Sequence, residues 1–304
     1  MSELDQFEMG IGTWAWGDKG VWGYGENYND SDLLQTFLAA VNAGAYFFDT
    51  AEVYGDGLSE TYLGRFMKER PQVKFYTASK FMPFPWKIKT SELFKSLKAS
   101  LKRLDIPQLD LYQIHFPMPF RSIETWMEPL AAAVKEGLVK EVGVSNYSRS
   151  QMLRAQDALG KHGVPLTSNQ VQYSLVRRKM EFNGVLDECK KSNIKLIAFS
   201  PLGMGMLSGK YTPQNPPKGP RRIFYFNQLG RIQVLVKRLK EIGETHGGKT
   251  CNQVALNWLL RKGVLPIPGA KSAEQVKENL GAIGWRLTGA EMTELDELSS
   301  KFTW

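Results

Sequence analysis

Short apolar runs alternate with longer amphipathic segments along almost the whole chain. The apolar runs are too short for helices and have no helical spacing, which favours buried strands. They lie at Met9–Thr13, Tyr46–Phe48, Phe75–Ala78, Leu109–Ile114, Val139–Val144, Ser168–Val171, Leu196–Phe199 and Val264–Ile267. The helix patterns carry start or stop signals and lie at Ser31–Ala43, Ser59–Lys68, Thr90–Leu104, Ile123–Glu136, Ser148–Leu159, Phe182–Lys191, Lys249–Arg261 and Ala273–Ala282.

This alternation predicts a single (β/α)₈ TIM barrel that spans residues 1–304 as one domain. Length does not decide the matter, because 304 residues would fit two domains while α/β barrels run to about 250 residues as one. Eight strands that each precede a helix, without a composition break or long linker, fit a closed barrel better than two open sheets. The longest insertion, Gly203–Asn227, follows the seventh strand.

Polar side chains lie where most of the predicted strands end. A barrel interior is filled by branched apolar side chains, and barrel enzymes carry their catalytic groups at the carboxyl ends of the strands. The residues at these ends are Asp49, Lys80, His115, Ser145, Asn146, Gln170, Phe199 and Ser200. We therefore expect an active site at this end of the barrel.

The stretch Ala45–Gly55, AYFFDTAEVYG, is the centre of that prediction. Its aromatic run forms a strand, Asp49 ends the strand, and Tyr54 precedes a Gly-Asp-Gly loop. Both polar groups can then project from one strand end and the loop above it. Taken alone, the stretch equally fits an aspartate that caps the next turn and a tyrosine packed on the barrel rim.

The formal net charge of +8 raises the possibility of nucleic-acid binding. The lysines of the Thr90–Leu104 helix and of the loop before it lack interleaved aromatic residues, so they favour a solvated helix face and no nucleic-acid partner. A positive field also suits a phosphorylated cofactor.

Cysteine content and hydropathy limit which compartments and which classes of protein fit the sequence. Cys189 and Cys251 lie in helical patterns without CxxC pairing, which predicts a reducing compartment and no metal site. No apolar run approaches the roughly 18 residues of a membrane span, and the polar start MSELDQ does not fit a signal peptide. We expect a cytoplasmic protein without membrane contact, or a plastid protein if a transit peptide has been removed.

The combined motifs make the chain similar to the aldo-keto reductase superfamily over nearly its whole length. The matching segments, in family order, are GIGTWAWG, FDTAEVYG, LDLYQIHFP, GLVKEVGVSNYS, SNQVQYS, FSPLGMGMLSGKY, NQVALNWLL and IPGAKSAEQVKENLGAIGW. The chain most resembles plant and cyanobacterial members, which share GIGTWAWG and a GKYTPxNPPxGPR loop. The resemblance implies a catalytic tetrad of Asp49, Tyr54, Lys80 and His115.

The chemistry of such a tetrad follows from carbonyl reduction. Hydride goes to carbon and a proton must reach oxygen, so an acid must lie beside the bound hydride donor. Tyr54 is the candidate acid, Lys80 is a cation that eases its proton loss, and Asp49 holds the ammonium in place. His115 can hydrogen-bond the substrate oxygen. Considered alone, Lys80 also fits the pattern of a surface lysine, and His115 fits that of a histidine in the core.

The resemblance also implies a nicotinamide cofactor held by the second half of the barrel. No GxGxxG motif opens a helix after the first strand, so a Rossmann-type site is not expected. Ser145, Asn146 and Gln170 would hold the carboxamide, because an amide side chain both donates and accepts. Phe199 would stack on the ring. The resemblance further assigns cofactor contacts to Thr13, Trp14, Ser200, Leu202 and Met206.

The segment after the last predicted strand contains the residues expected to bind the adenosine part of the cofactor. Lys271 and Ser272 precede a helix, where a cation, a hydroxyl and a helix N-terminus can bind a ribose 2′-phosphate, although a helix cap beside a solvated lysine also fits. Many relatives have an arginine in this helix where this chain has Gln275, which weakens the preference for NADPH over NADH. Glu278 and Asn279 match positions that contact adenine.

The expected activity is NADPH-dependent reduction of an aldehyde or ketone to an alcohol, with NADH a weaker cofactor. The partner is a small-molecule carbonyl substrate, and we expect a monomer or a weak oligomer. A regulatory protein that binds the cofactor, similar to a channel β-subunit, is the alternative within the same resemblance. Aromatic residues that could wall an apolar substrate pocket are Trp16, Trp22, Trp86 and Phe116.

Overall fold

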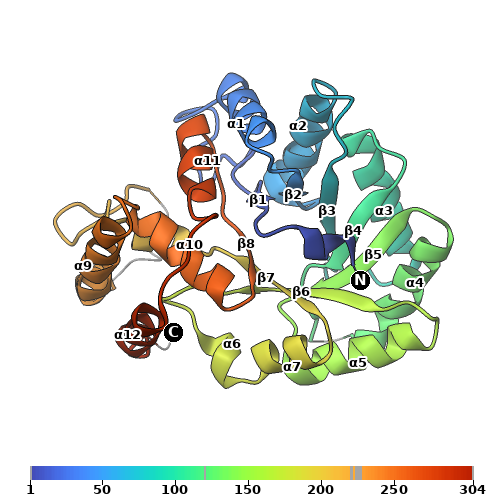
Figure 1. Cartoon of the computed structure of the whole chain (residues 1–304). Helices are drawn as coiled ribbons and strands as arrows, with labels where there is room; N and C mark the ends of the chain where they lie inside the picture. The colour runs from blue at the N-terminus through green and yellow to red at the C-terminus, as the bar shows by residue number, and fades with distance from the viewer. Residues whose placement is uncertain (1, 120, 220–221, 223–227, 303–304) are drawn as a thin grey trace.

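The computed structural model describes residues 2–119, 121–219, 222 and 228–302. Its eight parallel strands pair in sequence order. They are β1 (Ile11–Gly12), β2 (Phe47–Asp49), β3 (Tyr76–Phe81), β4 (Leu109–Ile114), β5 (Val139–Ser145), β6 (Leu166–Gln172), β7 (Lys195–Phe199) and β8 (Leu265–Ile267). The Gly10 and Gly12 amides donate to the Pro266 and Pro268 carbonyls at 3.0 and 3.1 Å, so β1 lies against the β8 end of the sheet. The predicted (β/α)₈ TIM barrel is confirmed (Figure 1).

The helices surround this ring of strands (Figure 1). They are α1 (Asp30–Asn42), α2 (Leu58–Met67), α3 (Ser91–Leu104), α4 (Met127–Lys135), α5 (Arg149–Gly160), α6 (Lys179–Phe182), α7 (Val185–Lys191), α9 (Leu229–Thr245), α10 (Cys251–Arg261), α11 (Ala273–Leu280) and α12 (Gly289–Ser299). Short 3₁₀ helices lie at η1 (Glu3–Gln6), η2 (Tyr54–Gly57), η3 (Ile123–Trp126) and η4 (Gly203–Ser208). All the predicted helices are present within a few residues of their expected bounds, with two exceptions. The segment expected at Ile123–Glu136 divides between η3 and α4, and the segment expected at Phe182–Lys191 divides between α6 and α7.

Strand register brings the polar strand ends to one level of the barrel. Asp49 on β2 pairs with Ala78 on β3, and Lys80 on β3 pairs with Gln113 on β4. Across the barrel, Ser145 on β5 pairs with Gln170 on β6. Because all eight strands are parallel, these side chains share the carboxyl end of the barrel, where barrel enzymes place their chemistry.

The amino-terminal segment closes the opposite end, where the strands begin. Leu4 of η1 is fully buried in a cluster with Phe47, Tyr76 and Ile197, and the Phe7 ring centroid lies 5.3 Å from that of Tyr76. Figure 1 shows the dark-blue amino-terminal segment crossing the ring of strands. The base of the barrel is therefore packed with side chains rather than open as a channel.

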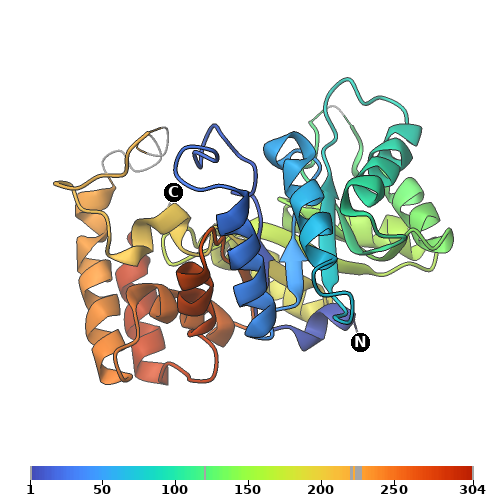
Figure 2. The ribbon, with the colours of Figure 1, turned by 90° about the horizontal axis from the view of Figure 1, so that it is seen from above.

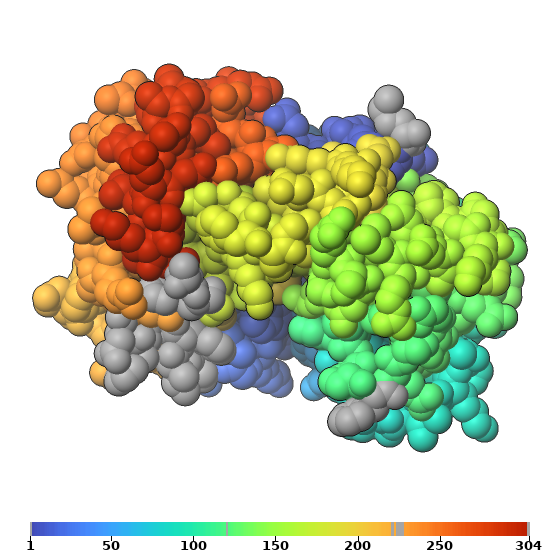
Figure 3. Space-filling view, turned by 90° about the horizontal axis from the view of Figure 1, so that it is seen from below, coloured from blue at the N-terminus to red at the C-terminus, as the bar shows by residue number. Residues whose placement is uncertain are grey.

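The carboxy-terminal helix α12 is joined to the barrel by a network of buried and partly buried polar groups. Arg178, at the start of α6, donates to the Ser299 hydroxyl at 2.8 Å and lies 3.2 Å from the Asp296 carboxylate. Lys262 Nζ lies 2.7 Å from Asp296 Oδ2. Figure 3 shows the red carboxy-terminal segment lying against the yellow-green segment that contains α6.

Every helix in the described part of the chain is too short or too polar to cross a membrane. Within the same residues, no cluster of histidine, cysteine or acidic side chains has the geometry of a metal site.

Candidate active site

Three charged or ionisable side chains meet at the carboxyl ends of β2 and β3. Lys80 Nζ lies 2.5 Å from Asp49 Oδ1 and donates to the Thr50 carbonyl at 2.8 Å, while the Tyr54 hydroxyl lies 3.4 Å away. Lys80 and Asp49 are 0% and 2% exposed, so this is a buried ion pair. The short helix η2 begins at Tyr54 and turns its phenol back toward β3. The structure thus brings the predicted tyrosine, lysine and aspartate together.

The protonation of this group depends on burial as well as on charge. Burial raises the pKa of the Tyr54 phenol above its ordinary value, and the opposing effect of Lys80 is smaller than the effect of burial. Burial lowers the pKa of Lys80, but Asp49 and Tyr54 together outweigh it and the net shift is upward. We expected Lys80 to ease proton loss from Tyr54. Lys80 does lower the pKa of Tyr54, but burial of the phenol outweighs this effect.

His115 follows β4 and stands on the other side of Tyr54. The two ring centroids are 5.7 Å apart and nearly perpendicular. Burial, followed by the charge of Lys80, lowers the pKa of His115 to about 3, so its imidazole is neutral at physiological pH. Its Nδ1 is buried and makes no hydrogen bond within the described residues. His115 can therefore take part as a neutral ring.

A hydrogen-bonded chain links the tetrad to β5 and β6. Gln170 Nε2 donates to Asp49 Oδ2 at 2.8 Å, and the Gln170 carbonyl accepts from the Ser145 hydroxyl at 2.9 Å. Asn146 donates to Ser145 Oγ at 3.0 Å and to the His115 carbonyl at 3.1 Å. Asn146 adopts a left-handed backbone conformation, with φ of 63°, which asparagine tolerates better than most residues. Ser145, Asn146 and Gln170 thus adjoin one another beside the tetrad.

A cavity of about 550 Å³ extends from this group to α11. Figure 2 shows the loops after β1, β3 and β7 rising on the side of the barrel away from the amino terminus. Thirteen residues of the predicted site line the cavity: Thr13, Trp14, Trp22, Asp49, Tyr54, Gln170, Phe199, Ser200, Leu202, Lys271, Gln275, Glu278 and Asn279. A volume of this size suits an organic cofactor or a substrate.

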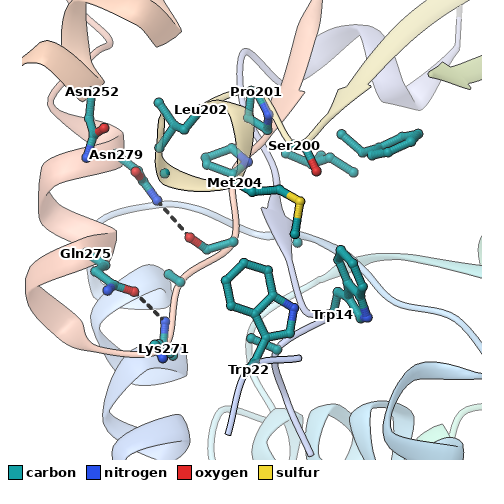
Figure 4. Close-up of a pocket in the computed structure, with 18 of the residues that line it drawn as sticks. Trp14, Trp22, Ser200, Pro201, Leu202, Met204, Asn252, Lys271, Gln275 and Asn279 are labelled. Atoms are coloured by element: carbon teal, nitrogen blue, oxygen red, sulfur yellow. Dashed lines mark hydrogen bonds between the residues drawn. The ribbon is translucent and has the colours of Figure 1, made fainter. Parts of the chain in front are cut away.

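The far end of the cavity is formed by the turn before α11 (Figure 4). Gln275 Oε1 accepts from the Lys271 backbone N–H at 2.9 Å, and Asn279 donates to the Gly269 carbonyl at 3.4 Å. Ser272 is the N-cap of α11, and its hydroxyl accepts from the Gln275 amide. Ser272 therefore caps the helix, whereas Lys271 lines the cavity together with Pro268, Gly269 and Ala270.

The turn after β7 forms another wall of the cavity and depends on glycine. Gly203 has a φ of 58°, and a Cβ there would come within 2.8 Å of Val176. Gly205 has a φ of 100°, which side-chain-bearing residues rarely adopt. Met204 lies between them and points toward Trp14 and Trp22 in Figure 4. The GMG sequence thus lets the chain turn sharply beside the cavity.

Several predicted site residues do not line the cavity. Trp16 is fully buried in the hydrophobic core and donates its indole N–H to the Ala270 carbonyl at 2.9 Å, so its assignment to the substrate pocket was wrong. Met206 is 6% exposed and packs in the same core. Trp86 is 70% exposed and stacks on Phe84, and Phe116 is 40% exposed and stacks on His115.

The sequence-based prediction missed part of the cavity wall. The additional residues, which come mainly from the segments after β7 and β8 and from α10, include Pro201, Met204, Gly205, Ser208, Lys210, Tyr211 and Asn252. The FSPLGMGMLSGKY motif contains six of them, so the unbroken length of this motif was the sequence signal that could have identified them. Asn252 lies on α10, far along the chain, and no local pattern singled it out.

This barrel and its strand-end tetrad have the architecture of a nicotinamide-dependent oxidoreductase. Residues 8–300 match the Aldo/keto reductase family model, and the chain belongs to this family. It is 40% identical to the chloroplastic pyridoxal reductase of Arabidopsis thaliana over 309 residues, which cover 97% of this chain and 84% of that protein. The sequence-based family assignment, including the likeness to plant members, is confirmed.

Two solved structures show the same barrel. A thermostable aldo-keto reductase in complex with the inhibitor epalrestat superposes with a TM-score of 0.78 at 31% identity, covering 96% of this chain and 95% of that one. An aldo-keto reductase from Klebsiella pneumoniae in complex with NADPH has a TM-score of 0.76 at 25% identity, covering 96% and 90% of the two chains.

Proposed function

We propose that this protein reduces an aldehyde or ketone to an alcohol, with hydride from NADPH and a proton from the Tyr54 hydroxyl. The observation that carries the proposal is the contact of Tyr54 with the buried Lys80–Asp49 pair at the wall of a cavity large enough for a cofactor. A tyrosine whose pKa is raised stays protonated at neutral pH, as a proton donor must.

The cavity suits a dinucleotide. Its near end offers the amide of Gln170 and the ring of Phe199, and its far end offers the cation of Lys271. The amide can pair with a carboxamide, the ring can stack on a heterocycle, and the cation can pair with a phosphate. When bound, NADPH supplies the hydride. The NADPH complex of the Klebsiella pneumoniae structure supports the same cofactor here.

The residues around Tyr54 have separate tasks in the transfer. Lys80 favours the phenolate that forms as the proton leaves, and Asp49 fixes the lysine in place. His115, neutral in this environment, can hydrogen-bond the carbonyl oxygen and aim it at the phenol. The alcohol oxygen takes the Tyr54 proton as the carbonyl carbon takes the hydride. Solvent then reprotonates Tyr54.

We propose further that the substrate is a planar aromatic aldehyde such as pyridoxal. Trp14 and Trp22 line the cavity beside Tyr54, with the Trp14 ring centroid 6.3 Å from that of Tyr54 and 5.6 Å from that of Trp22. Aromatic walls of this kind favour flat rings. The 40% identity to the plant pyridoxal reductase supports the same class.

The test is NADPH oxidation by the purified protein against pyridoxal, an aromatic aldehyde without a ring nitrogen, methylglyoxal and a simple ketone. The proposal expects turnover of at least one aldehyde, with kcat/KM for the aromatic aldehydes above that for methylglyoxal. A parallel series with NADH should give lower kcat/KM. Tight NADPH binding without turnover of any carbonyl would instead favour a regulatory cofactor-binding protein.

A further inference from the structure

Glu52 is a nearly buried acidic residue next to the tetrad in the sequence. It lies in the segment that joins Asp49 to Tyr54, and its side chain is 11% exposed. Its Oε1 accepts from the Met82 backbone N–H at 2.6 Å and from Lys87 Nζ at 2.8 Å. One carboxylate oxygen therefore joins the segment after β2 to the segment after β3.

This link connects the groups whose separation matters for proton transfer. Tyr54 lies two residues after Glu52, and Lys80 lies two residues before Met82. The Glu52 backbone N–H also donates to the Lys80 carbonyl at 3.4 Å. A change in the Glu52–Met82 contact would therefore move the Tyr54 hydroxyl relative to the Lys80 ammonium, which now lie 3.4 Å apart.

Lys87 extends the link to α3. Its ammonium donates to Ser96 Oγ at 2.8 Å and lies 4.6 Å from the Phe81 ring centroid, and its side chain is 14% exposed. Burying two charges costs desolvation that their attraction need not repay, so such a pair is weak evidence for a gain in stability. The arrangement instead fixes geometry, since it joins the segments after β2 and β3 to α3.

We propose that Glu52 and Lys87 form a clamp that positions Tyr54 against Lys80. Both are positioning residues, because neither lines the cavity that would hold cofactor and substrate. This inference rests on the proposed reductase function. It deepens that function by adding a second ion pair, Glu52–Lys87, to the residues that set the position of Tyr54.

A matched control is the carboxylate that contacts the other end of β3. Asp110 is also buried, and it accepts from the Thr77 backbone N–H at 2.8 Å and from Lys140 Nζ at 2.5 Å. Thr77 lies near the start of β3, whereas Met82 follows its end. Asp110 itself belongs to β4, and Asp110→Asn removes a buried carboxylate that contacts β3 at the end away from the tetrad.

The kinetic test compares Glu52→Gln, Lys87→Met and Lys87→Arg with Asp110→Asn. Misplacement of reacting groups by about 1 Å can cost a hundredfold in rate, so we expect Glu52→Gln and Lys87→Met to lower kcat by about tenfold to a hundredfold. KM and the NADPH dissociation constant should change less than threefold, and Lys87→Arg should recover most of the rate. A kcat for Glu52→Gln and Lys87→Met within twofold of the Asp110→Asn value would overturn the clamp.

A second readout does not depend on turnover. Hydrogen–deuterium exchange followed by mass spectrometry should show faster exchange in both segments, residues 50–57 and 82–90, in Glu52→Gln and Lys87→Met but not in Asp110→Asn. Exchange unchanged in both segments contradicts the clamp. If the wild-type protein reduces no carbonyl, the proposed function fails, while the exchange result still decides whether the clamp holds these segments together.

Discussion

Lys80 Nζ lies 2.5 Å from Asp49 Oδ1 but 3.4 Å from the Tyr54 hydroxyl. The ammonium is thus paired with the carboxylate and only weakly bonded to the phenol. Burial of the phenol outweighs the opposing charge of Lys80, so the pKa of Tyr54 is raised. At neutral pH the tyrosine keeps its proton, as reduction requires. We expect reduction to be lost on the alkaline side only when the phenol ionises.

Lys80→Met should lower kcat at least about a hundredfold and shift the alkaline limb of the pH–rate profile. Removing the cation raises the pKa of Tyr54 further, because Lys80 is the group that opposes burial. The alkaline limb should therefore move to higher pH. The variant also leaves Asp49 as a buried charge without a cation, which costs about 3–5 kcal/mol of stability. Steady-state rates across pH and urea unfolding measure the two effects. An alkaline limb identical to that of the wild type would mean that Lys80 does not tune Tyr54.

His115 should make stability depend on pH. Its pKa is about 3 in the folded protein against an ordinary value of 6.5, so the unfolded chain binds the extra proton first. Its contribution is complete above pH 6.5 and is lost as pH falls from 6.5 toward 3. At pH 5 the loss is about 2 kcal/mol. We therefore expect the free energy of unfolding of His115→Gln to fall less than that of the wild type between pH 7.5 and pH 5. Parallel losses in the two proteins would show that His115 is not buried as a neutral ring.

Lys271→Ala should weaken NADPH binding far more than NADH binding. The cofactors differ by the 2′-phosphate, and a charge-assisted hydrogen bond to it is worth about 1.5–3 kcal/mol, or roughly tenfold or more in affinity. The structure places Lys271 in the cavity, while Ser272 is engaged as the helix cap. Dissociation constants follow from fluorescence quenching at low and high salt, and added salt should weaken NADPH binding selectively. Lys277→Ala, in the helix α11 that follows Lys271 but outside the cavity lining, is the matched control. Equal losses of affinity for NADPH and NADH would mean that Lys271 does not bind the 2′-phosphate and is only a lysine near the start of the helix.

Most of the fold was predictable because strand and helix periods differ clearly along the chain. The helices α9 and α12 were nevertheless missed. Apolar residues of α9 follow helical spacing at Leu229, Ile232, Val236 and Leu239, but the helix begins directly after the long insertion. In α12 the signal is a capping box between Thr288 and Glu291. Both signals were present in the sequence.

The candidate site was predictable where it depends on strand ends. Parallel strands bring Asp49 and Lys80 to one level whatever the loops do, and the structure brings them together as expected. Aromatic side chains in loops carry no such constraint. Trp16 and Trp22 are six residues apart in one loop, yet the first is buried in the core and the second lines the cavity. Their directions depend on tertiary packing, which composition and spacing do not encode.

The most direct test of the account is Tyr54→Phe, measured for both cofactor binding and turnover. The substitution removes the hydroxyl that lies 3.4 Å from Lys80 and keeps the ring that packs beside Trp14 and His115. We predict an NADPH dissociation constant within about threefold of the wild-type value, together with a fall in kcat of at least about a hundredfold. A variant that binds NADPH normally and retains near-normal turnover would show that Tyr54 is not the proton donor.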